Sequence, residues 1–393
     1  MLFGDERKTV LIYRNDLLPL SETFIREQVL ALRRWRPVLL GRRLLNQLPL
    51  DGIAFRVLDS EAPSLPKKLI REARGLAGVV PAKVTRALGL EQAQLIHAHF
   101  GVDALDAWPV ARALNVPMVV TLHGYDIRVH HEWWERGRAG FRMRFYPRRL
   151  LQMSKDPRIA FIAVSESIRD RAIEFGIPHH KIWVRYIGVD QGKFSPGSVQ
   201  ISRRAPRVLF VGRLVEKKGC AYLIEAMANV RRQIPAAQLA VVGDGPLRGD
   251  LEQLANLRGL QIEFLGSLPN NEVRHQLDQA RLFCLPSVTA ENGDAEGLPI
   301  SILEAQASGV PVVTSALGAV GEAVKHGVNG LCFSERDVDE LTSQLLTILS
   351  NDVMADEMAS ASVRSIRDSF DHRLLAAQLE ATYDEAARLA ASA

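Results

Sequence analysis

Short apolar runs alternate along the chain with longer stretches in which polar and apolar residues mix. Most of these runs are apolar at every position, which is typical of strands buried on both faces of a parallel sheet. Helix-length segments separate them, so the pattern predicts repeated strand–helix–strand units. The expected strands are residues 9–13, 37–41, 53–58, 95–97, 118–122, 159–164, 182–186, 207–212, 238–243, 261–266, 282–286 and 310–314.

This array of strands occurs twice, and a polar stretch that contains Pro196, Gly197 and Pro206 separates the two copies. We therefore predict an α/β protein of two Rossmann-like, doubly wound domains with a cleft between them. The domains are expected at residues 1–198 and 199–370, and a terminal helix in 371–393 is expected to cross back to the first domain. Ligands of such sheets bind beyond the carboxyl ends of the strands, so the functional residues are expected in the loops that follow them.

Composition agrees with this picture. The chain has 393 residues, of which 47% are hydrophobic and 24% are charged, as in a soluble globular protein. Its three cysteines form no CxxC pair, which argues against a zinc knuckle or a disulfide framework. The first residues show no signal-peptide pattern, and no apolar run approaches the roughly 18 residues of a membrane span. A cytoplasmic protein is therefore expected.

Charge is distributed unevenly between the two halves. Residues 1–195 contain 31 Lys and Arg against 20 Asp and Glu, whereas the remaining residues contain 18 against 25. A basic half favours an anionic partner, which could be phospholipid, nucleic acid or a phosphorylated substrate.

The densest motif of the second half places two carboxylates eight residues apart. Glu296 precedes a helix whose first turn suits Pro299, and Glu304 lies inside that helix. Backbone N–H groups near Gly297 and Leu298 would form a helix N-terminus, which favours a phosphate or a sugar oxygen. A carboxylate can accept two hydrogen bonds, so it suits the neighbouring hydroxyls of a ribose.

Two cations follow the first strand of this half. Arg213 and Lys218 bracket a turn where they would neutralise a diphosphate without a metal ion, although Lys217 is as good a candidate on charge alone. The turn at Gly243 ends the next strand and would bring backbone close to a ligand. Leu268 follows the third strand and would line a base with apolar atoms.

Together these motifs resemble the retaining glycosyltransferases of family GT4, which have the GT-B fold. The resemblance rests on residues 212–219, 241–246, 264–268 and 296–304. In that family this domain binds the sugar-nucleotide donor. The resemblance implies that Glu304 holds the ribose and that Arg213 and Lys218 hold the diphosphate. It also implies that the backbone at Gly243 lies close to the donor and that Leu268 lies beside the base. Glu296 and the backbone amides of Gly297 and Leu298 would contact the transferred sugar.

In the first half, the strand that ends at residue 122 places His123 at the expected cleft. A neutral histidine can donate a hydrogen bond to a sugar hydroxyl or a phosphate. The resemblance assigns a donor-sugar contact to His123, which completes a catalytic set with Glu296, Arg213 and Lys218, and an acceptor-side role to Asp126.

His97 and His99 lie on one face of their strand, and only Asp103 is a nearby candidate for a further metal ligand. We interpret them as cleft lining, with His99 on the acceptor side. Asp337 and Asp339 form a DxD sequence at the start of a helix, which favours capping of that helix. No metal ion or other cofactor is expected.

The loop that begins at Arg14 lacks the Gly-Gly pair of many relatives. Its sequence, RNDLLPLSETFI, resembles the branch of the family that contains colanic-acid and related exopolysaccharide glycosyltransferases. Ser21 and Glu22 are assigned to the acceptor side, although Ser21 is also a good helix N-cap.

Arginines and aromatic residues interleave over residues 133–155, and the basic stretches at 33–43 and 67–86 add to them. This combination suits anionic lipid headgroups, and a solvated helix is the alternative. No nucleic-acid-binding module is recognisable, so nucleic acid is not expected.

The sequence therefore predicts a retaining, metal-independent transfer of a hexosyl group from a UDP- or GDP-sugar. The expected acceptor is a saccharide linked to polyprenyl diphosphate, at the inner face of the cell membrane. Two alternatives stay open: a sugar-nucleotide epimerase of the same fold, and a non-catalytic nucleotide-sugar-binding protein at the membrane.

Overall fold

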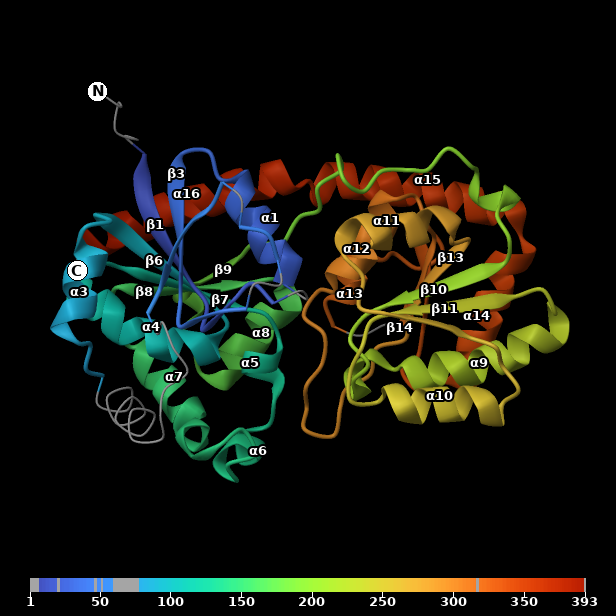
Figure 1. Ribbon diagram of the computed structural model, residues 1–393, viewed down its shortest axis with the longest axis horizontal. Helices are drawn as coiled ribbons and strands as arrows, with labels where there is room; N and C mark the ends of the chain where they lie inside the picture. The colour runs from blue at the N-terminus through green and yellow to red at the C-terminus, as the bar shows by residue number, and fades with distance from the viewer. Residues whose placement is uncertain are drawn as a thin grey trace. The chain divides into compact units, whose positions relative to one another are not determined.

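The computed structural model describes residues 7–19, 22–45, 48–50, 52–58, 78–315 and 318–391. The chain forms two compact units (Figure 1). One contains the described residues up to Tyr186 together with those from Arg373 onward, and the other is Ile187–His372.

The first unit is built on a seven-stranded sheet in which every pairing is parallel. Its strand order is β5-β3-β1-β6-β7-β8-β9. The strands are β1 (Lys8–Tyr13), β3 (Trp35–Gly41), β5 (Ala54–Val57), β6 (Ala93–His99), β7 (Met118–Leu122), β8 (Ile159–Ala163) and β9 (Ile182–Val184). The order reverses direction between β1 and β6, so the carboxyl ends of these two strands form the switch point at which doubly wound sheets bind ligands.

The second unit repeats this plan with the six-stranded parallel order β12-β11-β10-β13-β14-β15. The strands are β10 (Arg207–Val211), β11 (Gln238–Val242), β12 (Glu263–Gly266), β13 (Leu282–Leu285), β14 (Val312–Ser315) and β15 (Gly330–Phe333). Its switch point lies between the carboxyl ends of β10 and β13.

Helices lie on both sides of each sheet (Figure 1). Those of the first unit are α1 (Thr23–Ala31), α3 (Ala82–Gly89), α4 (Gly101–Leu114), α5 (Tyr125–Arg128), α6 (His131–Glu135), α7 (Tyr146–Ser154) and α8 (Glu166–Phe175). Those of the second are α9 (Cys220–Gln233), α10 (Arg248–Leu257), α11 (Asn270–Gln279), α12 (Ile300–Ala307), α13 (Val320–Ala323), α14 (Val338–Ser350) and α15 (Asp352–Ser369).

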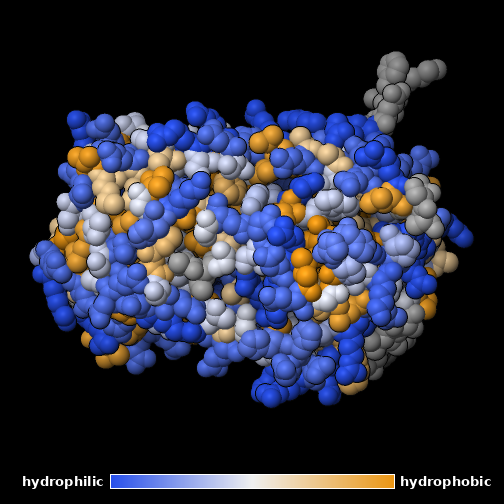
Figure 2. All heavy atoms as spheres, turned by 180° about the vertical axis from the view of Figure 1, so that it is seen from behind, coloured by the Kyte–Doolittle hydropathy of each residue, from blue (hydrophilic) through white to orange (hydrophobic). Residues whose placement is uncertain are grey.

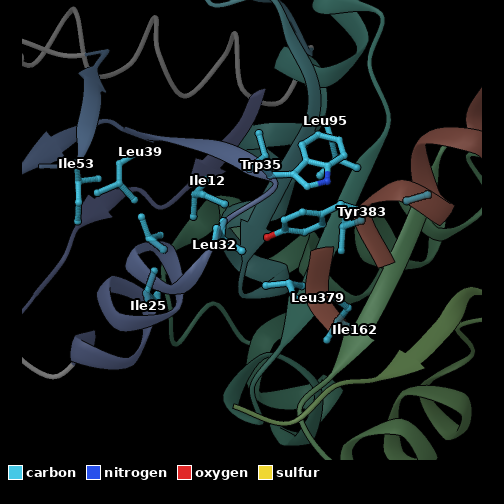
Figure 3. Close-up of a cluster of buried hydrophobic side chains, with 14 of the residues drawn as sticks. Ile12, Ile25, Leu32, Trp35, Leu39, Ile53, Leu95, Ile162, Leu379 and Tyr383 are labelled. Carbon is cyan, nitrogen blue, oxygen red and sulfur yellow. The ribbon is translucent and has the colours of Figure 1, made fainter. Parts of the chain in front are cut away.

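The last helix, α16 (His372–Ala391), follows the second unit but packs within the first. Its residues Leu379 and Tyr383 join the buried cluster of the first unit, where Tyr383 meets Trp35 edge-to-face at 5.5 Å (Figure 3). A carboxylate oxygen of Glu380 accepts hydrogen bonds from the backbone N–H groups of residues 33–35. Apolar burial and these three bonds together hold the helix against the start of β3.

The structure differs from the sequence expectations at several element boundaries. The chain passes from the first unit to the second at residues 186–187, whereas the sequence predicted this boundary at 198–199. Val189 and Phe194 already belong to the second unit and are buried. The strand β15 was not expected from the sequence, nor was the small pair β2 (Asp16–Leu17) and β4 (Arg43–Leu44). Pro299 is the residue before α12 rather than within its first turn.

Asp337 caps α14 as expected, since its side chain accepts a hydrogen bond from the N–H of Glu340 at 2.8 Å. Asp337, the first aspartate of the DxD sequence, therefore has a structural role at the start of a helix.

Candidate functional site

Three loops of the second unit converge at the carboxyl edge of its sheet because glycines allow their backbones to touch. A Cβ on Gly243 would lie 2.0 Å from the carbonyl oxygen of Gly212, and one on Gly219 would lie 1.8 Å from that of Pro286. Both glycines also have positive φ angles, +132° and +66°. The loops after β10, β11 and β13 therefore form one surface at the switch point, and no larger residue fits at these two positions.

Two lysine–carboxylate pairs join the loop after β10 to the loop that precedes α12. The ammonium of Lys218 lies 3.0 Å from Oε2 of Glu296, and that of Lys217 lies 3.1 Å from Oδ1 of Asp294. Burial alone would lower the pKa of Lys217, but the charges of Glu296 and Asp294 outweigh burial and raise it. Lys217 therefore keeps its positive charge beside the loop that precedes α12.

The remaining donor-site candidates lie in α12, in the loop before it, and in the loops that follow β10 and β12. Arg213 is exposed directly after β10, and no ion-pair partner is found for it among the described residues. Glu304 lies in α12 with only 8% of its surface exposed, and Leu298 is equally buried. The structure places Gly297 in the loop before α12 and the half-buried Leu268 after β12.

In the first unit, three histidine rings lie together at the carboxyl ends of β6 and β7. Nδ1 of His99 lies 3.1 Å from Nε2 of His123, and the rings of His97 and His99 are 4.3 Å apart. His97 and His99 are buried, whereas His123 is half-buried. Burial lowers the pKa of all three rings, to about 3 for His97 and well below the usual value for the other two.

Asp126 holds the backbone around His123 in place. Its carboxylate is fully buried and accepts hydrogen bonds from the N–H groups of Gly101, His123 and Gly124 at 2.9–3.3 Å. Burial raises its pKa, and these backbone donors act in the opposite direction. The geometry therefore gives Asp126 a positioning role for the loop, and its acceptor-side role stays a prediction.

Arg14 directly follows β1 at the carboxyl edge of the sheet. Its guanidinium pairs with Glu22 and Asp103 and lies over the ring of Phe100 at 4.4 Å. Asn15 extends this network, since its side chain donates to Asp103 and Asp106. Glu22 is thus held at the switch point of the first unit, while the other acceptor candidate of this loop, Ser21, lies outside the described residues.

Only part of the basic aromatic segment is available at the surface. Trp134 and Tyr146 are core residues, and Arg142 pairs with Asp106 at 2.6 Å. Phe141 and Phe145 are 68% and 41% exposed. The exposed arginines near them are Arg136, Arg138, Arg144 and Arg148. Most of the basic stretch at 67–86 lies outside the described residues.

Sequence reasoning left Lys217 as an alternative to Lys218 and did not assign roles to Arg14, Asp294 or Tyr383. The structure ties all four residues to the two candidate sites. A charged residue directly after the first strand was a usable signal for Arg14, because that position is at the switch point. The pairing of Lys217 with Asp294 joins distant segments and leaves no local pattern.

Among the described residues, no group of three or more His, Cys, Asp or Glu side chains is arranged so that it could hold a metal ion. Among them, too, no helix is long and apolar enough to cross a membrane. Polar residues cover most of the face that Figure 2 shows, and apolar residues form small separate patches on it.

Comparisons with known proteins agree for both units. Residues 26–193 match the family model "Glycosyltransferase Family 4", and residues 193–364 match "Glycosyl transferases group 1". The chain belongs to glycosyltransferase family GT4. Both units are thus accounted for by glycosyltransferase domains, and the expectation of a glycosyltransferase is confirmed.

Among curated relatives, the amylovoran biosynthesis glycosyltransferase AmsK of Erwinia amylovora is 28% identical over 291 residues, 73% of this chain and 69% of that protein. The putative colanic acid biosynthesis glycosyltransferase WcaL of Escherichia coli is 34% identical over 213 residues, 54% of this chain and 52% of that protein. This second match thus spans about half of the relative.

Among solved structures, that of Anabaena HepE in complex with UDP and glucose matches with a TM-score of 0.77 and 19% identity. The match covers 96% of this chain and all of that one. At this identity the likeness concerns the fold, and it confirms the expected GT-B architecture of two Rossmann-like domains.

Proposed function

We propose that this glycosyltransferase moves a hexosyl group from a nucleotide-diphospho-sugar to a saccharide acceptor, with retention of configuration and without a metal ion. The observation that carries the proposal is the switch point of the second unit. There, Lys218 pairs with Glu296 in the loop before α12, Arg213 follows β10, and Glu304 lies inside α12. HepE, the structural neighbour, was solved with UDP, which supports a nucleotide at this edge.

The leaving group of such a transfer is a nucleoside diphosphate, on which negative charge develops as the glycosidic bond breaks. Arg213 would meet this charge as a planar fork, Lys218 as a point charge, and the N–H groups at the start of α12 as dipoles. Glu304 would accept hydrogen bonds from the ribose. Stabilisation of the leaving diphosphate is then the main contribution of the protein.

The acceptor hydroxyl attacks the anomeric carbon on the face from which the diphosphate departs. Its proton passes to the leaving phosphate oxygen, so one C–O bond forms, one breaks and the proton is accounted for. We propose that His123, which follows β7 and contacts His99, meets the sugar of the donor. Glu22 is the candidate for contact with the acceptor, while His99, also assigned to the acceptor side, is buried and contacts His123.

We further propose that the acceptor is a lipid-linked intermediate of exopolysaccharide synthesis. The names of AmsK and WcaL place those relatives in amylovoran and colanic acid biosynthesis. The exposed Phe141 and Phe145 among arginines offer a surface for anionic headgroups, so the enzyme would work in the cytoplasm as a peripheral membrane protein.

The donor is tested first by thermal unfolding with UDP, GDP, ADP, CMP and the matching sugar nucleotides, all with EDTA present. A nucleotide at a hundred times its Kd adds about 2.7 kcal/mol of stability. We expect one nucleoside diphosphate to stabilise the wild type and Glu357→Ala, an exposed α15 control, but not Glu304→Ala. Stabilisation that appears only without EDTA contradicts the metal-free site, and equal stabilisation of Glu304→Ala contradicts the ribose contact.

A further inference from the structure

The three clustered histidines, His97, His99 and His123, extend from the core of the first unit to the half-buried loop after β7. His97 has both ring nitrogens occupied: Nδ1 lies 2.6 Å from the hydroxyl of Tyr383, and Nε2 lies 2.6 Å from that of Thr121. Burial raises the pKa of Tyr383 well above its usual value, so its hydroxyl keeps its proton. His97 is thus locked between α16 and β7, and the ring of His99 packs against it.

His99 is satisfied on one side only. Its Nδ1 lies 3.1 Å from Nε2 of His123, whereas its Nε2 is buried and has no hydrogen-bond partner among the described residues. The side chains that face it are His97, His123 and Arg14, and each of them disfavours a positive charge on this ring in addition to the effect of burial. His99 and His123 are therefore both neutral, and they share a single proton position between Nδ1 and Nε2.

Two arrangements of protons satisfy this bond, and they have different consequences. If His123 donates from Nε2, then His99 carries its proton on the buried Nε2, where an N–H group would lack an acceptor. If His99 donates from Nδ1, its Nε2 is a bare nitrogen and no N–H group is orphaned. Orphaned buried N–H groups are rarer in proteins than under-satisfied acceptors, which favours the second arrangement.

We propose that His99 is a positioning residue that fixes the tautomer of His123 by donating its Nδ1–H to Nε2 of His123. His123 then carries its own proton on Nδ1 and presents a hydrogen-bond donor, not a base, to a substrate oxygen. The rings of Phe100 and Phe24, at 4.2 and 5.3 Å from that of His123, restrict the orientation of this donor. The inference rests on the proposed function only in giving His123 a substrate to meet.

The tautomer is read directly by ¹⁵N NMR of histidine-labelled protein, with His123→Gln used for assignment. Protonated and bare ring nitrogens resonate far apart, so the result does not depend on activity. We expect protonated Nδ1 and bare Nε2 in His123 of the wild type at pH 7. A bare Nδ1 in His123 overturns the proposal.

Two substitutions of His99 separate the hydrogen bond from the packing. Asn places an amide N–H close to the position of Nδ1, whereas Leu fills the space without a donor. We expect His99→Leu to lose the fixed tautomer of His123 and His99→Asn to keep it, with His180→Leu, an exposed site, as the control. If His123 keeps its protonated Nδ1 in folded His99→Leu, then His99 does not set the tautomer.

Turnover gives the functional readout, measured as release of nucleoside diphosphate from the donor found in the thermal screen. We expect His99→Leu to lower kcat by about tenfold, the factor that one hydrogen bond supplies, with the Kd for the nucleoside diphosphate unchanged. His99→Asn should recover most of this loss. Equal losses of kcat in both variants would assign His99 a packing role. Absence of nucleotide binding by the wild type would count against the proposed function alone.

Discussion

The ammonium of Lys218 lies 3.0 Å from Oε2 of Glu296, although 78 residues separate them in the chain. Both side chains are largely buried, with 15% and 10% of their surfaces exposed. The pair brings a cation and a carboxylate of the donor-site motifs to one point beside α12. Lys217 is held by two carboxylates, since its ammonium lies 3.1 Å from Asp294 and 3.9 Å from Glu296. A diphosphate would compete only with Glu296 for Lys218, so we expect Lys218 to be the phosphate ligand.

Substitution of the two adjacent lysines should therefore have different effects, one on binding and one on stability. Lys218→Ala should weaken binding of the nucleoside diphosphate about 10- to 100-fold, because it removes a charge-assisted hydrogen bond. Lys217→Ala should instead lower stability by about 1–3 kcal/mol, because it leaves Asp294 buried without its cation. Calorimetric titration and urea unfolding of both variants measure the two effects, and the reverse result would exchange the assignments.

We expect Arg213 to bind the donor and to contribute little to stability. Because it is exposed and lacks an ion-pair partner among the described residues, Arg213→Ala should leave the unfolding temperature unchanged. Loss of a charge at the leaving diphosphate should lower kcat by about 100-fold. The exposed Arg364→Ala serves as a matched control. Wild-type turnover in Arg213→Ala would remove Arg213 from the leaving-group site.

Asp126 should stabilise the loop that carries His123. In Asp126→Asn one acceptor oxygen becomes an NH₂ group that faces backbone N–H donors, so we expect a loss of about 1–3 kcal/mol in unfolding free energy. Asp170→Asn on the surface is the control and should change little. If urea unfolding shows equal stability for the two variants, the buried hydrogen bonds do not hold this loop.

The buried neutral histidines should make stability depend on pH. The pKa of His97 falls from 6.5 to about 3 in the folded protein, so its contribution is complete above pH 6.5 and is lost as pH falls below that value. In this range the unfolded chain binds a proton that the folded one does not. Between pH 7.5 and 5.5, wild type should lose about 1.4 kcal/mol more than His97→Gln. Parallel pH profiles from thermal unfolding would contradict a neutral His97.

The exposed phenylalanines and arginines should bind anionic lipid. Phe141→Ser combined with Arg138→Gln and Arg144→Gln should weaken sedimentation with phosphatidylglycerol vesicles, since each well-placed cation contributes about 1 kcal/mol. Arg232→Gln with Arg364→Gln in the second unit gives a comparable loss of charge as a control. Unchanged sedimentation of the first variant would leave this segment as a solvated surface.

Local patterns were enough to predict most of the scaffold. The strand β7 begins and ends where the apolar run predicts it, and most of the other expected strands differ by only a few residues. Parallel strands that are buried on both faces leave continuous apolar runs, so they are legible without any tertiary information. The apolar run of β15 has only four residues, and β2 and β4 have two residues each, so these strands are identified by their sheet partners.

The sequence by itself determined the two doubly wound units and the family, and it supplied the candidates for the donor site, because these depend on local periodicity and on motifs that follow strands. Only the tertiary structure decided which lysine pairs with which carboxylate, that Asp126 supports backbone, and that Tyr383 contacts His97. These relationships join residues far apart in the chain. Their geometry depends on how the strand ends and the last helix pack, which no local pattern of residues records.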